Sequence, residues 1–188
     1  AANKGIVDAL AERGYKDGDR IKLDRQNAQA DQSNMKNIAQ RFVSEKSALI
    51  FAIATPAAQT VANTTKEIPI VGTAITDYES AKLVKSNDKP GTNVTGSSDM
   101  NPVAEQAALL KQLVPGVKTV GVMYNSSEVN SEVQVAAFRK EMDKLGIAVR
   151  IATVSSVNDI QQAARSLVGK VQAMYIPTDN VLASAMPT

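Results

Sequence analysis

Short apolar runs rich in Val and Ile alternate along this chain with longer segments in which apolar residues recur at helical spacing. The short runs predict buried β-strands at residues 20–27, 49–54, 68–74, 119–124, 148–154 and 173–177. Strand–helix alternation of this kind is typical of parallel sheets that are covered by helices on both faces. The pattern therefore predicts an α/β fold.

Several of the longer segments carry an apolar stripe with the i, i+3, i+4, i+7 spacing of an amphipathic helix. The stripes are Met35, Ile38, Ala39, Phe42 and Val43; Val103, Ala107, Leu110 and Val114; Val135, Phe138, Met142 and Leu145; and Ile160, Ala163, Ala164, Leu167 and Val168. Gly146 and Gly169 follow the last two stripes and are predicted to end those helices. The chain opens on a further predicted helix with Ile6 and Leu10 on one face. We interpret all of these stripes as core.

Two stretches of the chain are similar to each other. Residues 37–63 and 162–185 each contain an apolar helix, a short polar break, an apolar strand and a Thr-centred loop that opens a helix of small residues. The match is loose, but it favours two lobes of the same construction, which we place at residues 1–95 and 96–188. Residues 85–102 are rich in Asn, Asp, Gly, Ser and Pro. This segment is either the crossing between the lobes or an ordinary surface loop with an edge strand at 93–96.

Composition removes several classes of function. The 188 residues include no Cys and no His, which excludes a thiolate nucleophile, an imidazole base and a Cys/His metal site. The sequence has no Asp-rich calcium loop and no Gly-rich phosphate-binding loop, so we expect no enzymatic activity, no cofactor and no metal. The net charge of +2 comes without a basic stripe interleaved with aromatic residues, which disfavours nucleic acid as a partner. No apolar stretch reaches the length of a membrane span.

Ligands of open parallel sheets bind beyond the carboxyl ends of the strands, so the residues that follow each predicted strand are candidate contacts. These residues are mostly small, neutral and able to form hydrogen bonds, and they lie at 26–29, 55–59, 76–78, 125–128, 155–156 and 178–180. Such a composition suits a small polar or zwitterionic ligand, whereas a phosphate site would call for Lys or Arg. Thr76 is a candidate on this ground alone.

Residues 55–58 end a predicted strand abruptly and open a helix with no acidic residue in its first turn. We expect Thr55 to be the N-cap and Pro56 to occupy the first helical position. The amides of Ala57 and Ala58 then remain as free donors at the positive end of the helix. A carboxylate bound there would gain charge-assisted hydrogen bonds without any Arg. The alternative is a self-capped helix start that binds nothing.

Other strand ends leave two interpretations open. Ser126 and Ser127 either cap the helix that follows them, with acidic residues in its first turn, or contact a ligand. Asp77 and Asp179 either bind an ammonium group or close their own loops as Asx turns. The residue types alone do not decide between these roles.

Five segments resemble those of a known family: RQNAQADQ at 25–32, LIFAIATPAAQ at 49–59, NVTGSSD at 93–99, GVMYNSSEVNSEVQV at 121–135 and SLVGKVQAMYIPTDN at 166–180. Along essentially its whole length, the chain resembles the substrate-binding proteins of ABC transporters for aromatic amino acids, of the tryptophan/tyrosine type. The resemblance implies a two-lobed type I periplasmic-binding-protein fold, with parallel sheets flanked by helices, that closes on a ligand in the inter-lobe cleft. Relative to that family we expect the chain to be incomplete at both ends, without the lipid-carrying Cys, the signal peptide, the first strand and roughly the last third.

The resemblance also implies roles for the candidate residues. It places the α-carboxylate of a free amino acid at Thr55 and Ala57 of one lobe and at Ser126 and Ser127 of the other. It places the α-ammonium near Asp77 or Asp179, and it uses the side chains of Asn27, Asn125 and Asn180 to fix the ligand's orientation.

A protein of this family is expected to be an extracytoplasmic monomer, periplasmic or anchored as a lipoprotein, that delivers Trp, Tyr or Phe to a membrane permease. Two alternatives share the fold: the effector-binding domain of a transcription regulator, and a sugar or nucleoside receptor. An α/β enzyme is a third alternative, against which the absence of His and Cys argues.

Overall fold

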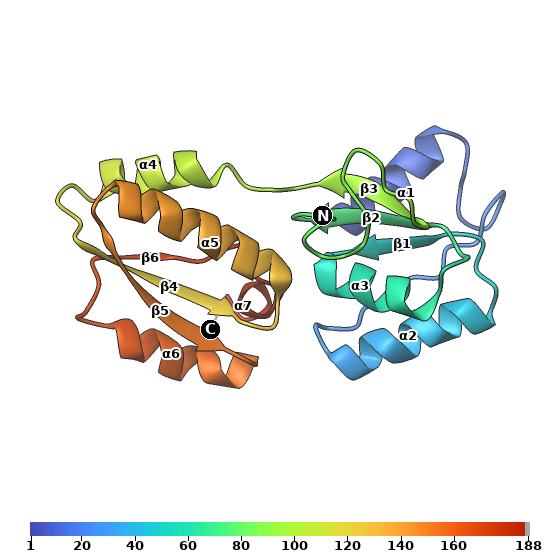
Figure 1. Ribbon diagram of the computed structural model, residues 1–188. Coiled ribbons are helices and arrows are strands. Elements are labelled where there is room, and N and C mark those ends of the chain that lie inside the picture. Colours follow the sequence, from blue (N-terminus) through green and yellow to red (C-terminus); the bar gives the residue numbers. More distant parts are fainter. Residues whose placement is uncertain (187–188) are drawn as a thin grey trace. The chain divides into compact units, whose positions relative to one another are not determined.

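The computed structural model describes residues 1–186 of the chain (Figure 1). The chain forms two compact units, Ala1–Asp99 and Met100–Thr188, which we call the first unit and the second unit. Each contains a three-stranded parallel sheet with helices packed against it. The boundary that the sequence placed after residue 95 would fall inside strand β3 (Val94–Ser98), which pairs with β2 (Ile70–Ile75) of the first unit. The assignment of the two units as the lobes of a receptor remains a prediction.

The first unit is built on the strand order β1-β2-β3. Besides β2 and β3, its elements are α1 (Ala2–Glu12), α2 (Gln32–Ser44), β1 (Ile50–Ile53) and α3 (Thr55–Thr64). Ile70 in the central strand lies opposite Ile50 on one side and Val94 on the other, and all three side chains are buried. α3 packs against β1 and β2, and α2 packs beside α3. The first turn of α3 therefore lies at the carboxyl end of β1, where parallel sheets bind ligands.

The prediction of a strand at residues 20–27 is wrong. The chain forms only an isolated bridge there, between Asp17 and Ile21. The carboxylate of Asp17 binds this segment instead: its Oδ2 accepts from Arg25 Nη2 at 2.8 Å, and its Oδ1 accepts from Leu23 N at 2.8 Å. The alternation of Ile21 and Leu23 with polar residues is strand-like, but a strand also needs a neighbour, and the described residues supply none along this segment. The other predicted strands are confirmed within about two residues at either end.

Two glycines allow the strands β2 and β3 to approach Tyr78. A Cβ atom at Gly96 would lie 2.1 Å from Gly72 O and 2.2 Å from Tyr78 Oη, and one at Gly72 would lie 2.6 Å from Tyr78 Oη. No side chain fits at either position. The Tyr78 hydroxyl donates to Ser97 O at 3.1 Å. Burial of the ring, with a contribution from the Asp99 carboxylate, raises the pKa of Tyr78 to about 12.

The second unit has the strand order β5-β4-β6, with its most buried strand in the centre. Its elements are α4 (Val103–Leu113), β4 (Thr119–Asn125), α5 (Val129–Lys144), β5 (Ala148–Val154), the 3-10 helix η1 (Val157–Asp159), α6 (Ile160–Leu167), β6 (Ala173–Tyr175) and α7 (Asn180–Ser184). Figure 1 shows α4 and α5 on one face of this sheet and α6 on the other. A central strand between two helical layers is buried on both faces, which explains the continuous apolar run of β4.

The core of the second unit is split by its sheet into two clusters. On the α5 side, Phe138 stacks on Tyr175 with ring centroids 3.9 Å apart, and Val120 and Val122 pack beside them. On the opposite side, Met123 packs with residues of β5, α6 and α7. Burial of the Tyr175 ring raises the pKa of its hydroxyl to about 12. Because successive side chains of a strand point to opposite faces of the sheet, β4 contributes residues to both clusters.

The helical stripes are confirmed as helices, but they are buried to different degrees. Ala107, Phe138 and Leu167 are fully buried, whereas Ala39 is the one buried residue of α2 and α1 has none. Val168 is a correction to the predicted core. It is the C-cap that follows the last residue of α6, and its side chain is 75% exposed. None of the helices within residues 1–186 has the length and apolar character needed to cross a membrane.

Candidate functional site

The start of α3 is open, as the sequence predicted, but its N-cap is not Thr55. The N-cap is Ala54, whose φ of 78° lies in the left-handed region and whose N–H donates to Thr73 O at 3.0 Å. The turn from β1 into α3 takes only this one residue, so Thr55 is already helical and its hydroxyl caps nothing. Ala has no side-chain acceptor, and the first turn contains no acid. The helix therefore begins without any group that neutralises its positive end.

Two N–H groups in this first turn have no partner within residues 1–186. They belong to Thr55 and Ala57, while Pro56 has no N–H and Ala58 N donates to Ala54 O at 3.1 Å. Thr55 is 2% exposed, and its hydroxyl is also without a partner in the described chain. The side chains of this turn are themselves small, which favours a close approach of an acceptor group to the backbone. This arrangement suits a carboxylate.

The loop after β2 holds the next two predicted contacts. Thr76 is buried, and its carbonyl accepts a hydrogen bond from Ser98 Oγ at 2.6 Å. Asp77 closes its own loop, because Oδ1 accepts from Ser80 N at 2.6 Å and Oδ2 from Asn87 Nδ2 at 3.2 Å. Partial burial would raise the pKa of Asp77, but the hydrogen bonds from Ser80 and Asn87 outweigh it and hold the pKa below its ordinary value. The Asx-turn interpretation thus accounts for the contacts that the Asp77 carboxylate makes.

Asn27 is exposed in an irregular segment just before a turn, and it does not lie at the end of a strand. Its Oδ1 accepts a hydrogen bond from Gln29 N at 2.9 Å, and Gln29 and Ala30 both have positive φ. Within residues 1–186 its side chain makes no hydrogen bond to the other predicted site residues, so its role as a ligand contact stays a prediction.

The second unit carries a fully buried carboxylate at Asp179, which is 2% exposed. Asp179 is the N-cap of α7, and its Oδ1 accepts from Leu182 N at 2.9 Å. Its Oδ2 accepts from Asn125 N at 2.6 Å and from Ser131 Oγ at 2.7 Å. Asp179 therefore connects the start of α7 to the end of β4 and to α5.

A second buried carboxylate, Glu128, was missed by the sequence analysis as a site residue. Glu128 occupies the N-cap position of α5, but its side chain does not cap that helix. Its Oε2 accepts from Asn180 N at 3.0 Å and from Asn180 Nδ2 at 2.6 Å, and its Oε1 accepts from Val181 N at 3.1 Å. Oε2 also accepts from Asn130 Nδ2 at 3.0 Å. The carboxylate of Glu128, from the loop after β4, thus caps α7, the helix that follows the loop after β6.

Asn125 and Ser127 belong to the same network. Asn125 Oδ1 accepts from Ser127 N at 2.9 Å and from Ser127 Oγ at 2.7 Å, and Asn125 is buried. Ser126 lies beside this turn with an exposed side chain. The structure therefore brings Asn125, Ser127, Asp179 and Asn180 together, with Ser126 at the margin.

A buried layer of amides lies behind the two carboxylates. Gln134 is 0% exposed, and its side chain donates to Asn130 O at 2.9 Å and to Thr178 Oγ1 at 2.5 Å. Asn130 Nδ2 donates to Thr178 O at 2.9 Å, while Asn130 Oδ1 is the single fully buried side-chain N or O atom without a partner within residues 1–186. Neither Glu128 nor Asp179 pairs with a Lys or Arg in the described chain. The loop end of the second unit thus carries two buried negative charges that hydrogen bonds alone offset.

The helix starts of the second unit differ from the bare start of α3. The start of α7 is capped by Asp179 and Glu128. The start of α5 does leave the amides of Val129 and Asn130 without a partner in the described residues, but it is flanked by Glu128 and by Glu132 in its first turn. The negative charges of these two carboxylates disfavour the binding of an anionic ligand group at the start of α5.

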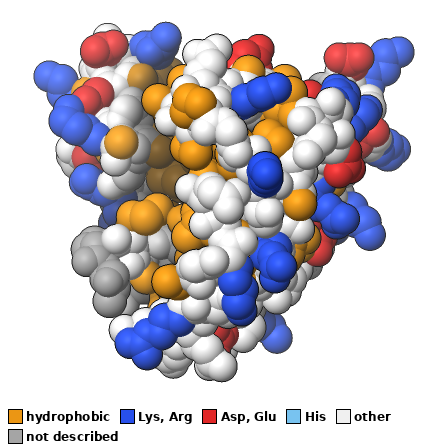
Figure 2. All heavy atoms as spheres, turned by 90° about the vertical axis from the view of Figure 1, so that its left-hand side faces the viewer, with side chains coloured by type: hydrophobic (Ala, Val, Ile, Leu, Met, Phe, Trp, Pro, Cys, Tyr) orange, Lys and Arg blue, Asp and Glu red, His pale blue; other side chains and the backbone are white. Residues whose placement is uncertain are grey.

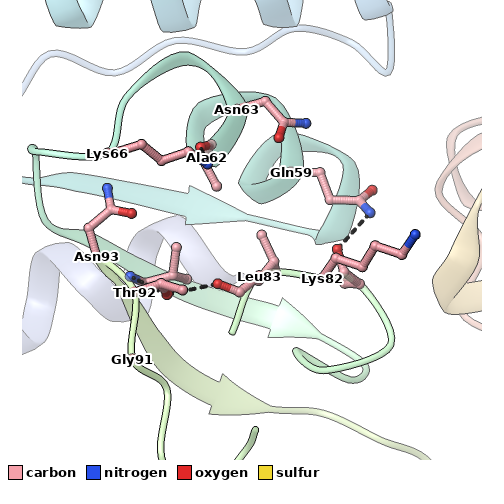
Figure 3. Close-up of a pocket in the computed structure, with 11 residues that line it drawn as sticks. Gln59, Ala62, Asn63, Lys66, Lys82, Leu83, Gly91, Thr92 and Asn93 are labelled. Carbon is pink, nitrogen blue, oxygen red and sulfur yellow. Dashed lines mark hydrogen bonds between the residues drawn. The ribbon is translucent and has the colours of Figure 1, made fainter. Parts of the chain in front are cut away.

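The first unit also has a hollow of about 440 Å³ between the second half of α3 and residues 81–83 and 91–94 (Figure 3). Its polar side chains hold its walls together, since Gln59 Nε2 donates to Ala81 O at 3.0 Å and Thr92 Oγ1 donates to Leu83 O at 2.8 Å. None of the predicted site residues lines it. Within residues 1–186, no group of acidic side chains is placed to hold a metal ion.

Comparison with known proteins agrees with the resemblance seen in the sequence. A family described as ABC transporter substrate binding protein matches residues 1–188. A curated relative from Clostridioides difficile, named tyrosine-binding protein, is 48% identical over 186 residues, which cover 99% of this chain and 54% of that protein. The chain therefore spans about half the length of that relative.

Solved structures show the same fold. The ABC domain from Streptococcus pneumoniae in complex with L-Trp matches with a TM-score of 0.95 at 46% identity, over 98% of this chain and 62% of that one. A leucine binding protein from Thermotoga maritima matches with a TM-score of 0.69 at 20% identity, over 92% of this chain and 49% of that one. The predicted fold class, of the type I periplasmic-binding-protein kind with helix-flanked parallel sheets, is thereby confirmed.

Proposed function

Because the chain belongs to the family of ABC transporter substrate binding proteins, we propose that it is part of the solute-binding component of an importer for a free aromatic amino acid. The relative named for tyrosine binding and the structure bound to L-Trp support an aromatic ligand. The open start of α3 carries the proposal, because it offers free backbone donors and no acid where a ligand carboxylate would bind. An α-amino acid presents such a carboxylate together with an ammonium group.

The two units suit the two charged groups of this ligand. We assign the α-carboxylate to the free N–H groups of Thr55 and Ala57, supported by the absence of any nearby acid in α3. The second unit carries two buried carboxylates without a cationic partner, Glu128 and Asp179, and their field favours a cation over an anion. The α-ammonium is therefore assigned to the side of Asp179. Thr76, Asp77, Asn27, Asn125, Ser126, Ser127 and Asn180 complete the proposed set of contacts.

Magnitudes explain why both charged groups must be recognised. Burial of an aromatic side chain of about 200 Å² contributes about 5 kcal/mol before association costs. Micromolar affinity requires about 8 kcal/mol net. Polar contacts must supply the difference, which they do best where water is excluded. We therefore propose that both charged groups of the ligand are bound by polar contacts from which water is excluded.

The family context supports further proposals about the whole protein. We propose that it works outside the cytoplasm as a monomer, periplasmic or anchored as a lipoprotein, and that it presents its ligand to a membrane permease. The family is one of binding proteins, and we propose that the ligand is released unchanged.

Titration calorimetry on the full-length protein with the standard amino acids tests the proposal. Trp, Tyr or Phe should bind more tightly than every other amino acid. Recovery of the ligand after long incubation, followed by NMR, should show no chemical change. Preference for a pentose or a purine would contradict the proposal and favour the sugar or nucleoside receptor.

A further inference from the structure

The amino ends of the strands of the second unit form a face of positive charge, which we call the basic face. In a β–α unit each helix runs back to the edge where the next strand begins, so α4, α5 and α6 all end at this edge. Hydrogen bonds hold the strand starts together there: Gln172 Oε1 accepts from Lys118 N at 3.1 Å, and Ala148 N donates to Lys118 O at 2.9 Å. The exposed cations of the basic face are Lys111, Lys118, Lys140, Lys144, Arg165 and Lys170.

Few acids balance these cations. Glu141 and Asp143 lie near the end of α5, and Glu141 pairs with Lys144 at 2.7 Å. The side chains of Lys118 and Lys170 have no partner in the described part of the chain. Figure 2 shows this end of the second unit, with blue Lys and Arg side chains spread over it and apolar side chains between them. The cations are spread over a surface and do not converge on one point.

Two apolar side chains protrude from the same face. Val168 is 75% exposed and Leu113 is 72% exposed, the highest values among the exposed large apolar residues that the structure describes. Leu113 ends α4 close in sequence to Lys118, and Val168 follows α6 close to Lys170. Each protruding apolar side chain therefore has a free ammonium group near it in the chain.

Stabilisation of helix ends explains only some of the cations on the basic face and none of its exposed apolar side chains. A cation in the last turn of a helix interacts favourably with the helix dipole, which accounts for Lys111, Lys144 and Arg165. Lys118 and Lys170 lie outside the helices, and Leu113 and Val168 gain nothing from exposure to water. In the first unit, by contrast, the cation in the last turn of α2, Arg41, pairs with Glu45 and Asp24.

We propose that the basic face binds an anionic membrane surface. Dispersed ammonium groups match the diffuse negative charge of lipid headgroups, and Leu113 and Val168 can enter the headgroup region as shallow apolar anchors. The ligand loops lie at the opposite, carboxyl edge of the same sheet, so membrane contact leaves them free. This inference is independent of which amino acid the protein binds.

Vesicle sedimentation tests the proposal on purified protein that carries no lipid modification. The protein should bind vesicles of phosphatidylcholine with phosphatidylglycerol, should not bind pure phosphatidylcholine, and should dissociate near about 1 M salt, where the Debye length falls to about 3 Å. The double variant Lys118→Glu and Lys170→Glu should bind at least about tenfold more weakly. The matched control Lys22→Glu and Lys36→Glu, which changes two exposed lysines of the first unit, should bind like the parent protein.

A third variant separates the two parts of the proposed contact. Leu113→Gln with Val168→Thr keeps every charge and should weaken vesicle binding several-fold. Circular dichroism and thermal melting should show that all variants stay folded. Absence of binding to anionic vesicles at low salt would overturn the proposal, as would equal binding by the Lys118/Lys170 variant and its control. Charge-dependent capture by an acidic protein surface without vesicle binding would also overturn it.

Discussion

The helices that follow the strands of the two units begin in surroundings of opposite charge. In the first unit, α3 follows the N-cap Ala54 with free amides and no acid in its first turn, while in the second unit Glu128 and Asp179 cap the start of α7 with buried carboxylates. The same strand-to-helix construction therefore offers positive potential in one unit and negative potential in the other. The difference shows that a shared fold does not set the polarity of a site, which depends on which single side chains reach the helix start. The proposed amino acid ligand carries one charged group of each sign.

The largest expected effect comes from breaking the carboxylate network of the second unit. Glu128→Ala removes the acceptor for Asn180 N, Asn180 Nδ2 and Val181 N. Buried donors left without a partner cost about 1–3 kcal/mol each, so the free energy of unfolding should fall by about 3 kcal/mol or more. Urea denaturation followed by circular dichroism measures this change.

The matched control for this prediction is Glu132→Ala. Glu132 lies in the first turn of the same helix, but it is exposed. Its replacement should change the free energy of unfolding by less than about 0.5 kcal/mol. Equal losses in the two variants would show that the capping of α7 by Glu128 contributes nothing specific.

A smaller effect is expected from giving the first unit the acid that it lacks. Ala57→Glu places a carboxylate in the first turn of α3, where it should raise the free energy of unfolding by about 0.3–1 kcal/mol. The same carboxylate competes with that of the ligand, so affinity for the amino acid should fall at least about tenfold. Calorimetry on the full-length protein measures the affinity. The neutral control Ala57→Gln should lose much less, and equal losses in both variants would point to size and not to charge.

The smallest effect concerns alkaline stability. The pKa values of Tyr78 and Tyr175 are raised from 10.0 to about 12 by burial, so both phenols hold their protons more tightly in the folded state. Their contribution is complete below about pH 10 and is lost as the pH rises toward about 12. The free energy of unfolding should fall over this window, by less than about 1.4 kcal/mol per pH unit for each tyrosine because solvent screens part of the effect.

Tyrosine replacement sharpens that test. Tyr78→Phe and Tyr175→Phe should each flatten the dependence of the unfolding free energy on pH above about pH 10. Urea titrations at several alkaline pH values measure the slope. A slope that stays the same in both variants would mean that other groups control alkaline unfolding.

Patterns in the sequence predicted the structure correctly where that structure depends on neighbouring residues alone. The apolar runs predicted β1, β2, β4, β5 and β6, and the absence of acids after Thr55 predicted the open start of α3. The failures have non-local causes. Residues 20–27 alternate like a strand, but they have no pairing partner among the described residues, and Val168 continues a helical stripe beyond the last turn of α6.

The amino-acid sequence by itself determined the fold class, the absence of thiol and imidazole chemistry and the bare helix start in the first unit, because periodicity and composition are properties of neighbouring residues. Only the tertiary structure decided that Glu128 caps a helix that begins 52 residues later, and that lysines from separate loops share one face. The strand order β5-β4-β6 places the ends of β4 and β6 side by side, and no local pattern encodes that order. In the second unit, contacts between distant segments therefore place carboxylates at a helix start. In the first unit, the positive potential comes from the start of α3 itself, which is a local feature of the chain.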